Sequence, residues 1–250
     1  MLGVLLKGMA KAVLPFGVRR WLRSHHKSWT RTQSFGKTRA EMLEQTAPIS
    51  RTFGIDRGES IDRYYIEQFL SKHASDIRGD VLEIENDKYT ERFGGERVSR
   101  AHVLHFQSGN PRATIVADLS AADPIESESF DCIILTQTLQ FIFDLRSAIA
   151  HIQRILKPGG VVLATVPGIS QVSRYDDERW GDYWRFTTSS VARLFEAAFP
   201  KDAVQIQSHG NALVASAFLH GLAMEEMRQE ELDFNDPDYQ LLITVRGVRE

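Results

Sequence analysis

Short apolar runs recur along the chain from residue 79 onward, and polar, acidic or glycine-containing residues follow each of them. Runs of this length without strict alternation are typical of strands that are buried on both faces of a sheet. The segments that we predict to be strands are 81–84, 97–106, 113–119, 130–135, 161–166, 204–207 and 239–245.

Apolar residues at helical spacing predict helices before and between these strands. The predicted helices cover residues 38–45, 60–73, 144–156, 189–199 and 212–227. Ser60 stands where the second helix needs an N-cap. The third should end at Lys157-Pro-Gly-Gly160, because Pro and paired glycines cannot continue a helix. Helices alternating with strands indicate an α/β fold.

Polar residues gather where the predicted strands end. Glu83 is the one carboxylate inside the first strand and needs a partner if it is buried, and Glu85 to Asp87 follow that strand directly. Asp118 ends the third strand, and Thr136 to Thr138 follow the fourth. Because ligands of open α/β sheets bind beyond the carboxyl ends of the strands, we expect the site there.

Three segments resemble class I S-adenosylmethionine (SAM) methyltransferases of the type 11-like group. They are Val81-Leu-Glu-Ile84, the strand from Asp131 into the polar loop at Thr136, and Arg154 to Pro167, which is the most specific match. The resemblance covers about residues 55–248. It implies a Rossmann-like doubly wound sheet of about seven strands, mostly parallel with an antiparallel last strand.

The same resemblance implies SAM as the cofactor. The residues that it places at the cofactor are Glu83, Ile84, Glu85, Asn86, Asp118, Leu119, Thr136, Gln137 and Thr138. Asp118 would lie beside the adenine, although an acid at this position could equally cap the next turn. Arg63, Tyr64 and Tyr65, on the helix before the first strand, are cofactor-lid candidates, with packing as the alternative for the two tyrosines.

Two features depart from the family pattern. Glu85, Asn86 and Asp87 replace the usual glycine-rich turn, in which bare backbone lies against the cofactor. The second strand ends without the acid that holds ribose hydroxyls, and only His102, His105 and Gln107 are polar there. A catalytically impaired binding or scaffolding protein of the same fold is therefore the alternative to an active methyltransferase.

The long loop 168–186 follows the fifth strand and should contact the acceptor. Its candidate acceptor contacts are Tyr175, Tyr183, Trp184 and Arg185, and Thr187 or Thr188 should cap the helix that follows. If the nucleophile is an oxygen, Tyr175, Asp176, Asp177 and His151 are the candidate bases. The resemblance suggests a small-molecule or a glycan- or lipid-linked acceptor, as in polysaccharide biosynthesis.

Charge divides the chain of 250 residues into two parts. Residues 1–40 carry nine Lys and Arg and no acid, and subtracting these from the 30 basic residues leaves 21 against 33 acidic ones. We therefore expect a basic, helical N-terminal arm with linker over residues 1–54 and a methyltransferase-like domain over residues 55–250. The arm is either a segment that lies on an anionic membrane surface or a basic arm that is flexible or packed on the domain.

Cysteine usage and motif content narrow the class further. The single cysteine, Cys132, lies in an apolar run, which suits a buried side chain in a reducing, cytoplasmic protein. The sequence holds no zinc-ligand spacing and no Walker loop, so we expect neither a metal nor a nucleic-acid partner. The oligomeric state stays open.

Overall fold

The computed structural model describes residues 44–250, and of these Ile49–Glu250 form one compact unit. Residues 1–43 of the predicted arm and linker, and most of the helix expected at 38–45, lie outside the described residues. The domain boundary at residue 54 therefore stays a prediction. No helix among residues 44–250 is long and apolar enough to cross a membrane.

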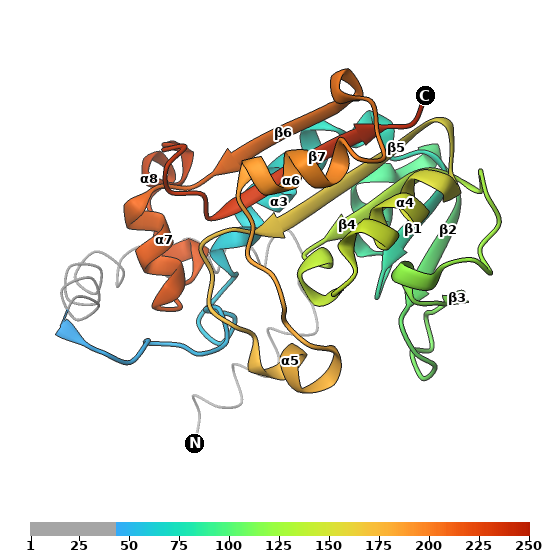
Figure 1. The fold of residues 1–250 in the computed structure, drawn as a ribbon. Helices are drawn as coiled ribbons and strands as arrows, with labels where there is room; N and C mark the ends of the chain where they lie inside the picture. Colours follow the sequence, from blue (N-terminus) through green and yellow to red (C-terminus); the bar gives the residue numbers. More distant parts are fainter. Residues whose placement is uncertain (1–43) are drawn as a thin grey trace, which may run out of the picture. The chain divides into compact units, whose positions relative to one another are not determined.

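A sheet of seven strands forms the centre of this unit, in the order β3-β2-β1-β4-β5-β7-β6 (Figure 1). All neighbouring strands pair in parallel except β7, which is antiparallel to both β5 and β6. The strands are β1 Gly79–Ile84, β2 Val98–His105, β3 Ile115–Val116, β4 Phe130–Thr136, β5 Leu156–Pro167, β6 Val204–His209 and β7 Leu242–Val248. This arrangement confirms the predicted Rossmann-like sheet with an antiparallel last strand.

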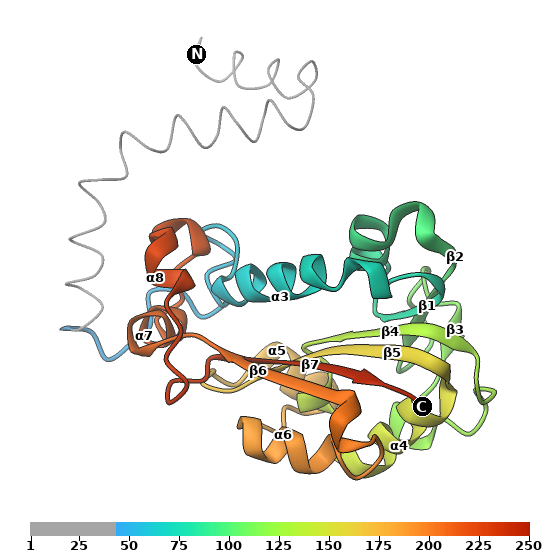
Figure 2. The same ribbon diagram turned by 90° about the horizontal axis from the view of Figure 1, so that it is seen from above.

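Helices cover both faces of the sheet, with α3 on one face and α4 and α6 on the other (Figure 2). Their bounds are α3 Ile61–Lys72, α4 Leu145–Ile155, α5 Arg174–Trp180, α6 Thr188–Phe195, α7 Ala212–Leu219 and α8 Gln229–Asp233. The main core lies under α4 and α6, where Ile149, Ile152 and Phe195 pack on the buried strands. Thr187 caps α6 through Ser190 N, as the sequence predicted.

Several predicted elements differ from the structure. The strand β5 begins at Leu156, so the Pro-Gly-Gly segment lies inside it, with Gly159 at a φ of 76°. The helix predicted over 212–227 ends at Leu219, because Gly221 adopts a φ of 72° in a turn where a Cβ would lie 2.3 Å from the Ser50 oxygen. The segment 168–186, predicted as a loop, contains α5, and α8 lies between the predicted helix 212–227 and the last strand. Ser60 precedes α3, but its side chain makes no capping hydrogen bond.

Charged residues form ion pairs at the amino-terminal edge of the sheet. The Lys157 ammonium lies 2.6 Å from Asp131 and 3.0 Å from Asp80, which also pairs with Arg100. The hydrogen bonds from Arg100 and Lys157 lower the pKa of Asp80 to about 2. Asp131 is thus held at the edge opposite the predicted site, and the functional residues must be sought at the carboxyl ends of the strands.

Candidate functional site

The sheet reverses its strand order between β1 and β4, and the hydrogen-bond ladder between these two strands is short. It pairs Val81 to Glu83 with Cys132 to Ile134, whereas β1 pairs with β2 as far as Ile84, and β4 pairs with β5 as far as Thr136. Beyond these residues β1 and β4 no longer pair with each other, while β1 stays paired with β2 and β4 with β5. The two central strands thus part at their carboxyl ends. Such a switch point is where open α/β sheets bind ligands.

A residue in the left-handed conformation follows each of these two strands. Glu85 has a φ of 70° and Gln137 a φ of 49°. Glycine adopts this region freely, but other residues do so at a cost of about 1–2 kcal/mol, and such strain tends to concentrate at functional sites. Glu85 therefore keeps the backbone conformation that the family's glycine favours, while its own side chain is exposed.

The Glu83 carboxylate is buried and fixes the turn that follows β1. It accepts hydrogen bonds from Tyr89 N at 3.2 Å, from Thr90 N at 2.8 Å and from Thr90 Oγ1 at 2.8 Å. Burial raises the pKa of Glu83, although these three donors oppose the shift. The partner that this carboxylate needs is thus the short helical segment Thr90–Gly94.

Backbone and side-chain contacts hold the acidic turn itself. The Glu85 N–H donates to Leu104 O at 3.0 Å, and Asn110 Nδ2 donates to Glu85 O at 2.7 Å. The Arg112 guanidinium forms an ion pair with Asp87 at 2.8 Å. The turn is therefore anchored to β2 and to the loop after it, and one of its two acids is neutralised.

The ends of β2 and β3 bring few groups toward this turn. His105, the last residue of β2, contacts the Gln107 carbonyl through Nδ1 at 2.6 Å. Asp118 Oδ1 accepts from both Ser120 N and Ser120 Oγ at 2.8 Å and so caps the short helical turn Leu119–Ala121, in which Leu119 is buried. The capping role is present, and a contact of Asp118 with adenine stays a prediction.

The loop after β4 is tied to β5. Gln137 N donates to Thr165 O at 3.0 Å, and Thr138 Oγ1 donates to Thr136 O at 3.1 Å. Gln140 is buried, and its Nε2 donates to Gln137 O at 3.0 Å. Thr136, Gln137 and Thr138 thus lie at the same end of the sheet as Glu83 to Asn86, on the other side of the switch point.

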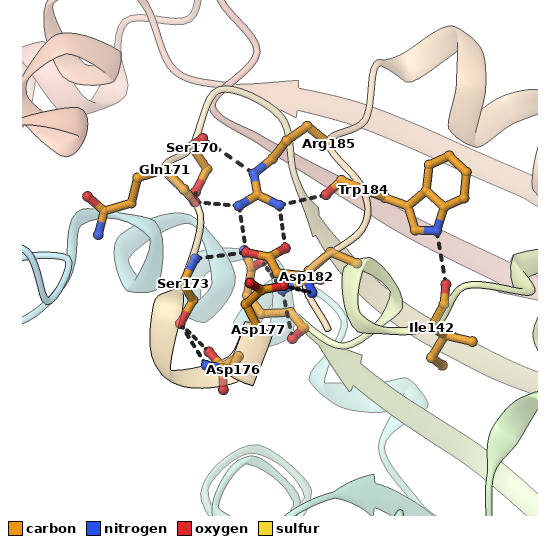
Figure 3. A network of polar contacts seen from close by, with 11 residues as sticks. Ile142, Ser170, Gln171, Ser173, Asp176, Asp177, Asp182, Trp184 and Arg185 are labelled. Carbon is orange, nitrogen blue, oxygen red and sulfur yellow. Dashed lines mark hydrogen bonds and ion pairs between the residues drawn. The ribbon is translucent and has the colours of Figure 1, made fainter. Parts of the chain in front are cut away.

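Arg185 organises the long loop after β5, as Figure 3 shows. Its guanidinium pairs with both carboxylate oxygens of Asp182 and donates to the carbonyls of Ser170, Gln171 and Trp184. Every one of these partners belongs to the same loop. The structure therefore gives Arg185 a role in shaping the loop, and its contact with the acceptor stays a prediction.

Two further contacts join this loop to the one after β4. The Tyr183 N–H donates to Gln140 O at 2.9 Å. Figure 3 shows the second contact, in which Trp184 Nε1 donates to Ile142 O at 3.0 Å. The Phe143 ring lies 5.4 Å from the Tyr183 ring and 5.8 Å from that of Trp184, and Phe143 and Tyr183 are 69% and 50% exposed. Gln140 and Phe143 have no signal in the sequence beyond their place after β4.

Three of the four candidate bases lie on α5, and the fourth, His151, lies on α4. Asp176 accepts from Ser173 Oγ at 2.5 Å, and Asp177 accepts from the Asp182 N–H at 3.1 Å. The Tyr175 ring is exposed and lies under the Arg179 guanidinium. His151 lies on α4 beside Arg154, which binds the carbonyls of the segment before β4, away from the carboxyl ends.

On α3, the two tyrosines pack against the segment that contains α8. Tyr65 is buried and its hydroxyl donates to Leu232 O at 2.9 Å, while the Tyr64 hydroxyl bonds Asp233. Burial raises the pKa of both, that of Tyr64 to about 12. Only Arg63 extends toward the turn after β1, where its Nη1 donates to the Tyr89 hydroxyl at 2.8 Å.

The strand order and the reversed last strand define the fold as a Rossmann-like doubly wound sheet, and polar groups gather at its switch point. Residues 68–164 match the family described as methyltransferase domain. This segment of the chain is thus similar to methyltransferase domains.

Among curated proteins, a probable S-adenosylmethionine-dependent methyltransferase of Mycolicibacterium smegmatis is 26% identical over 153 residues. The match spans 60% of this chain and 60% of that protein.

The fold is similar to solved methyltransferases. One is phosphoethanolamine N-methyltransferase 2 of Haemonchus contortus in complex with S-adenosyl-L-methionine, at 16% identity and a TM-score of 0.47, covering 69% of this chain and 49% of that one. Another is a SAM-dependent methyltransferase from Archaeoglobus fulgidus, at 11% identity and a TM-score of 0.47, covering 75% and 90% of the two chains.

Proposed function

We propose that this protein transfers a methyl group from SAM to a small-molecule or a glycan- or lipid-linked acceptor, with oxygen as the nucleophile. The observation that carries the proposal is the parting of β1 and β4 with a left-handed residue after each strand, within a segment that matches the methyltransferase domain family. Catalysis of this kind depends chiefly on positioning and on exclusion of water.

The residues at the switch point fit SAM in part. Glu83 and its turn leave the Glu85 backbone in the conformation that a close approach to the cofactor needs, and Gln137 offers a second backbone segment of the same kind. Asp118 and Leu119 supply the predicted adenine contacts. No carboxylate stands at the end of β2 for the ribose, where His105 and Gln107 are the polar groups. When bound, SAM supplies a methyl group on a sulfonium that is already activated.

The exposed rings of Phe143 and Tyr183 favour an acceptor with a flat or apolar face. They project from the loops after β4 and β5, on one side of the switch point, and hydrogen bonds join those two loops. The apolar face of a sugar ring packs on aromatic side chains in the same way as other apolar surfaces do. This supports a glycan acceptor, and hence a place in polysaccharide assembly.

Two further features of the proposal concern the cell. We infer a cytoplasmic location, which the free thiol of Cys132, buried in β4, supports. Contact with an anionic membrane through residues 1–30 follows from their cations and apolar residues and would bring the domain to a lipid-linked acceptor.

Calorimetric titration of SAM and, separately, of NADH into the purified chain tests the cofactor. We expect saturable binding of SAM and none of NADH. Transfer of a labelled methyl group to a panel of pyranosides and lipid-linked sugars then tests the acceptor. SAM binding without transfer to any compound would favour the second candidate, a binding protein that keeps the fold, which the acidic turn and the missing ribose acid support. Absence of SAM binding would refute the proposed methyl transfer.

A further inference from the structure

Gln140 carries a buried hydrogen-bond acceptor that the described part of the chain leaves unsatisfied. The residue is 5% exposed, and its Oε1 has no hydrogen-bond partner among residues 44–250. Its Nε2 donates to Gln137 O at 3.0 Å and to Gln137 Oε1 at 3.2 Å, which fixes the orientation of the amide. Because a buried acceptor without a donor is costly, this oxygen calls for a donor from a ligand.

The amide of Gln140 lies between the switch point and the loop after β5. Gln137, which receives its Nε2, is the left-handed residue that follows β4. The main-chain carbonyl of Gln140 accepts from the N–H groups of Tyr183 and Trp184, at 2.9 and 3.3 Å. A donor that reaches Oε1 therefore lies where an acceptor would meet the carboxyl end of the sheet.

Two exposed aromatic rings lie in the same pair of loops. Phe143 follows Gln140 by three residues, and its ring meets that of Tyr183 edge to face, with the centroids 5.4 Å apart and the planes at 76°. The Tyr183 ring lies against the backbone of Gly181, where a Cβ would approach it to 2.2 Å. The position of this ring is thus built into the loop, and the two rings form a fixed apolar surface.

A pyranose ring matches both features. Its C–H face packs on aromatic side chains, and the hydroxyls around its rim are hydrogen-bond donors. An apolar ring lacks the donor, and an open-chain polyol lacks the flat face. Water does not reach Gln140 Oε1, so a sugar hydroxyl that enters between the two loops gains a hydrogen bond without displacing solvent from this oxygen.

We propose that Gln140, Phe143 and Tyr183 form a subsite for one pyranose ring of the acceptor. The two aromatic rings bind its apolar face, and Gln140 Oε1 accepts a hydrogen bond from one of its hydroxyls. This inference rests on the proposed function. It makes Gln140 a specificity-determining residue that distinguishes a sugar from an apolar ring of similar size.

The test compares three probes by saturation-transfer NMR titration of the full chain in the presence of S-adenosylhomocysteine. Methyl β-D-glucopyranoside has both the apolar face and the hydroxyls, tetrahydropyran has the ring alone, and D-glucitol has the hydroxyls alone. The parent should bind the pyranoside about tenfold or more tightly than either of the others, because only this probe makes both kinds of contact.

Variants separate the two contacts. Gln140→Met removes the oxygen and should weaken pyranoside binding about fivefold or more but tetrahydropyran binding less than about twofold, whereas a structural role would weaken both probes alike. Phe143→Ala and Tyr183→Ala should weaken both probes about twofold to tenfold. Phe234→Ala is the matched control, since it removes a ring that is 64% exposed in another part of the domain, and it should change neither.

If Gln140→Met does not fold, as judged by its thermal transition, Gln140→Asn withdraws the oxygen by one methylene and should show the same selective loss. Equal weakening of the two ring probes in a folded Gln140 variant would overturn the inference. No change in either would do so too, and is the result expected if an ordered water satisfies Oε1. Calorimetric titration of SAM on the same samples tests the proposed function separately. A parent that binds no SAM refutes that function, whereas one that binds SAM without preferring the pyranoside overturns the inference alone.

Discussion

Replacing Glu85 with glycine tests the turn on which the cofactor site depends. Glu85 has a φ of 70°, which costs a residue with a Cβ about 1–2 kcal/mol, and glycine avoids that cost. Glycine in turn loses about 0.5–1 kcal/mol more conformational freedom on folding. The exposed Glu85 side chain makes no hydrogen bond or ion pair with the described residues, so no contact offsets the gain. We expect Glu85→Gly to stabilise the domain by about 0.5–1 kcal/mol, or roughly 1–4 °C in Tm.

The same change should tighten SAM binding, by about threefold to tenfold, or ~1 kcal/mol. Without a side chain, the turn lets the ligand approach the backbone, and the negative charge that opposes its carboxylate is gone. Glu85 also attracts the sulfonium and the amino group of SAM, and these attractions partly cancel its repulsion of the SAM carboxylate. Glu85→Gln, which keeps the volume and removes the charge, separates the two causes.

Thermal unfolding and calorimetric titration of SAM measure the two effects. Glu128→Gly is the control for the backbone, because Glu128 has a φ of 59° at the opposite end of β4 and pairs with Arg249 at 2.8 Å. It should leave SAM affinity unchanged. Weaker SAM binding by Glu85→Gly than by the parent would refute the reasoning, since it would mean that Glu85 contacts the ligand productively.

Three further predictions concern separate parts of the chain. Asp118→Ala should weaken SAM binding by about 1–3 kcal/mol without unfolding the domain, and a calorimetric affinity equal to the parent's would remove Asp118 from the adenine site. Burial lowers the pKa of His209 to about 4, so the folded state binds this proton less readily than the unfolded state does, and stability should fall as the pH drops from about 6.5 toward 4. In His209→Gln the denaturation midpoint should depend less on pH over that window. A pH profile equal to the parent's would contradict the assignment. Deleting residues 1–30 should abolish sedimentation with vesicles of anionic lipid, and raised salt should release the full chain, whereas equal sedimentation of both chains would rule out the arm.

The sheet could be predicted because its strands are encoded locally. Buried strands such as Phe130–Thr136 are continuous apolar runs, and their order follows from the resemblance of the segments around Glu83 and Arg154 to one family. Element ends were harder to predict. Leu156 to Gly160 reads as a helix stop followed by a turn, yet the pairing of Leu156 with Phe130 and the bond from Gly159 N to Arg249 O draw the segment into the sheet.

The candidate site was predictable in its residue types but not in its contacts. The sequence indicated Glu83 and Arg185 as important. It could not show that Thr90 donates to the Glu83 carboxylate or that Asp182 pairs with the Arg185 guanidinium, because both contacts depend on the conformation of a turn or loop. Gln140 gave no signal, since its importance lies in backbone and amide contacts that a sequence pattern does not encode.

The two left-handed residues also explain how a glycine-free turn can persist here. The Glu85 N–H bonds Leu104 O in β2, and the Gln137 N–H bonds Thr165 O in β5, so each strained residue extends a ladder away from the switch point. These bonds hold the two backbones apart whatever side chain they carry. The parting of β1 and β4 is therefore set by their pairing with β2 and β5 rather than by a glycine. A side chain such as that of Glu85 changes what can bind at this point but leaves the strands parted.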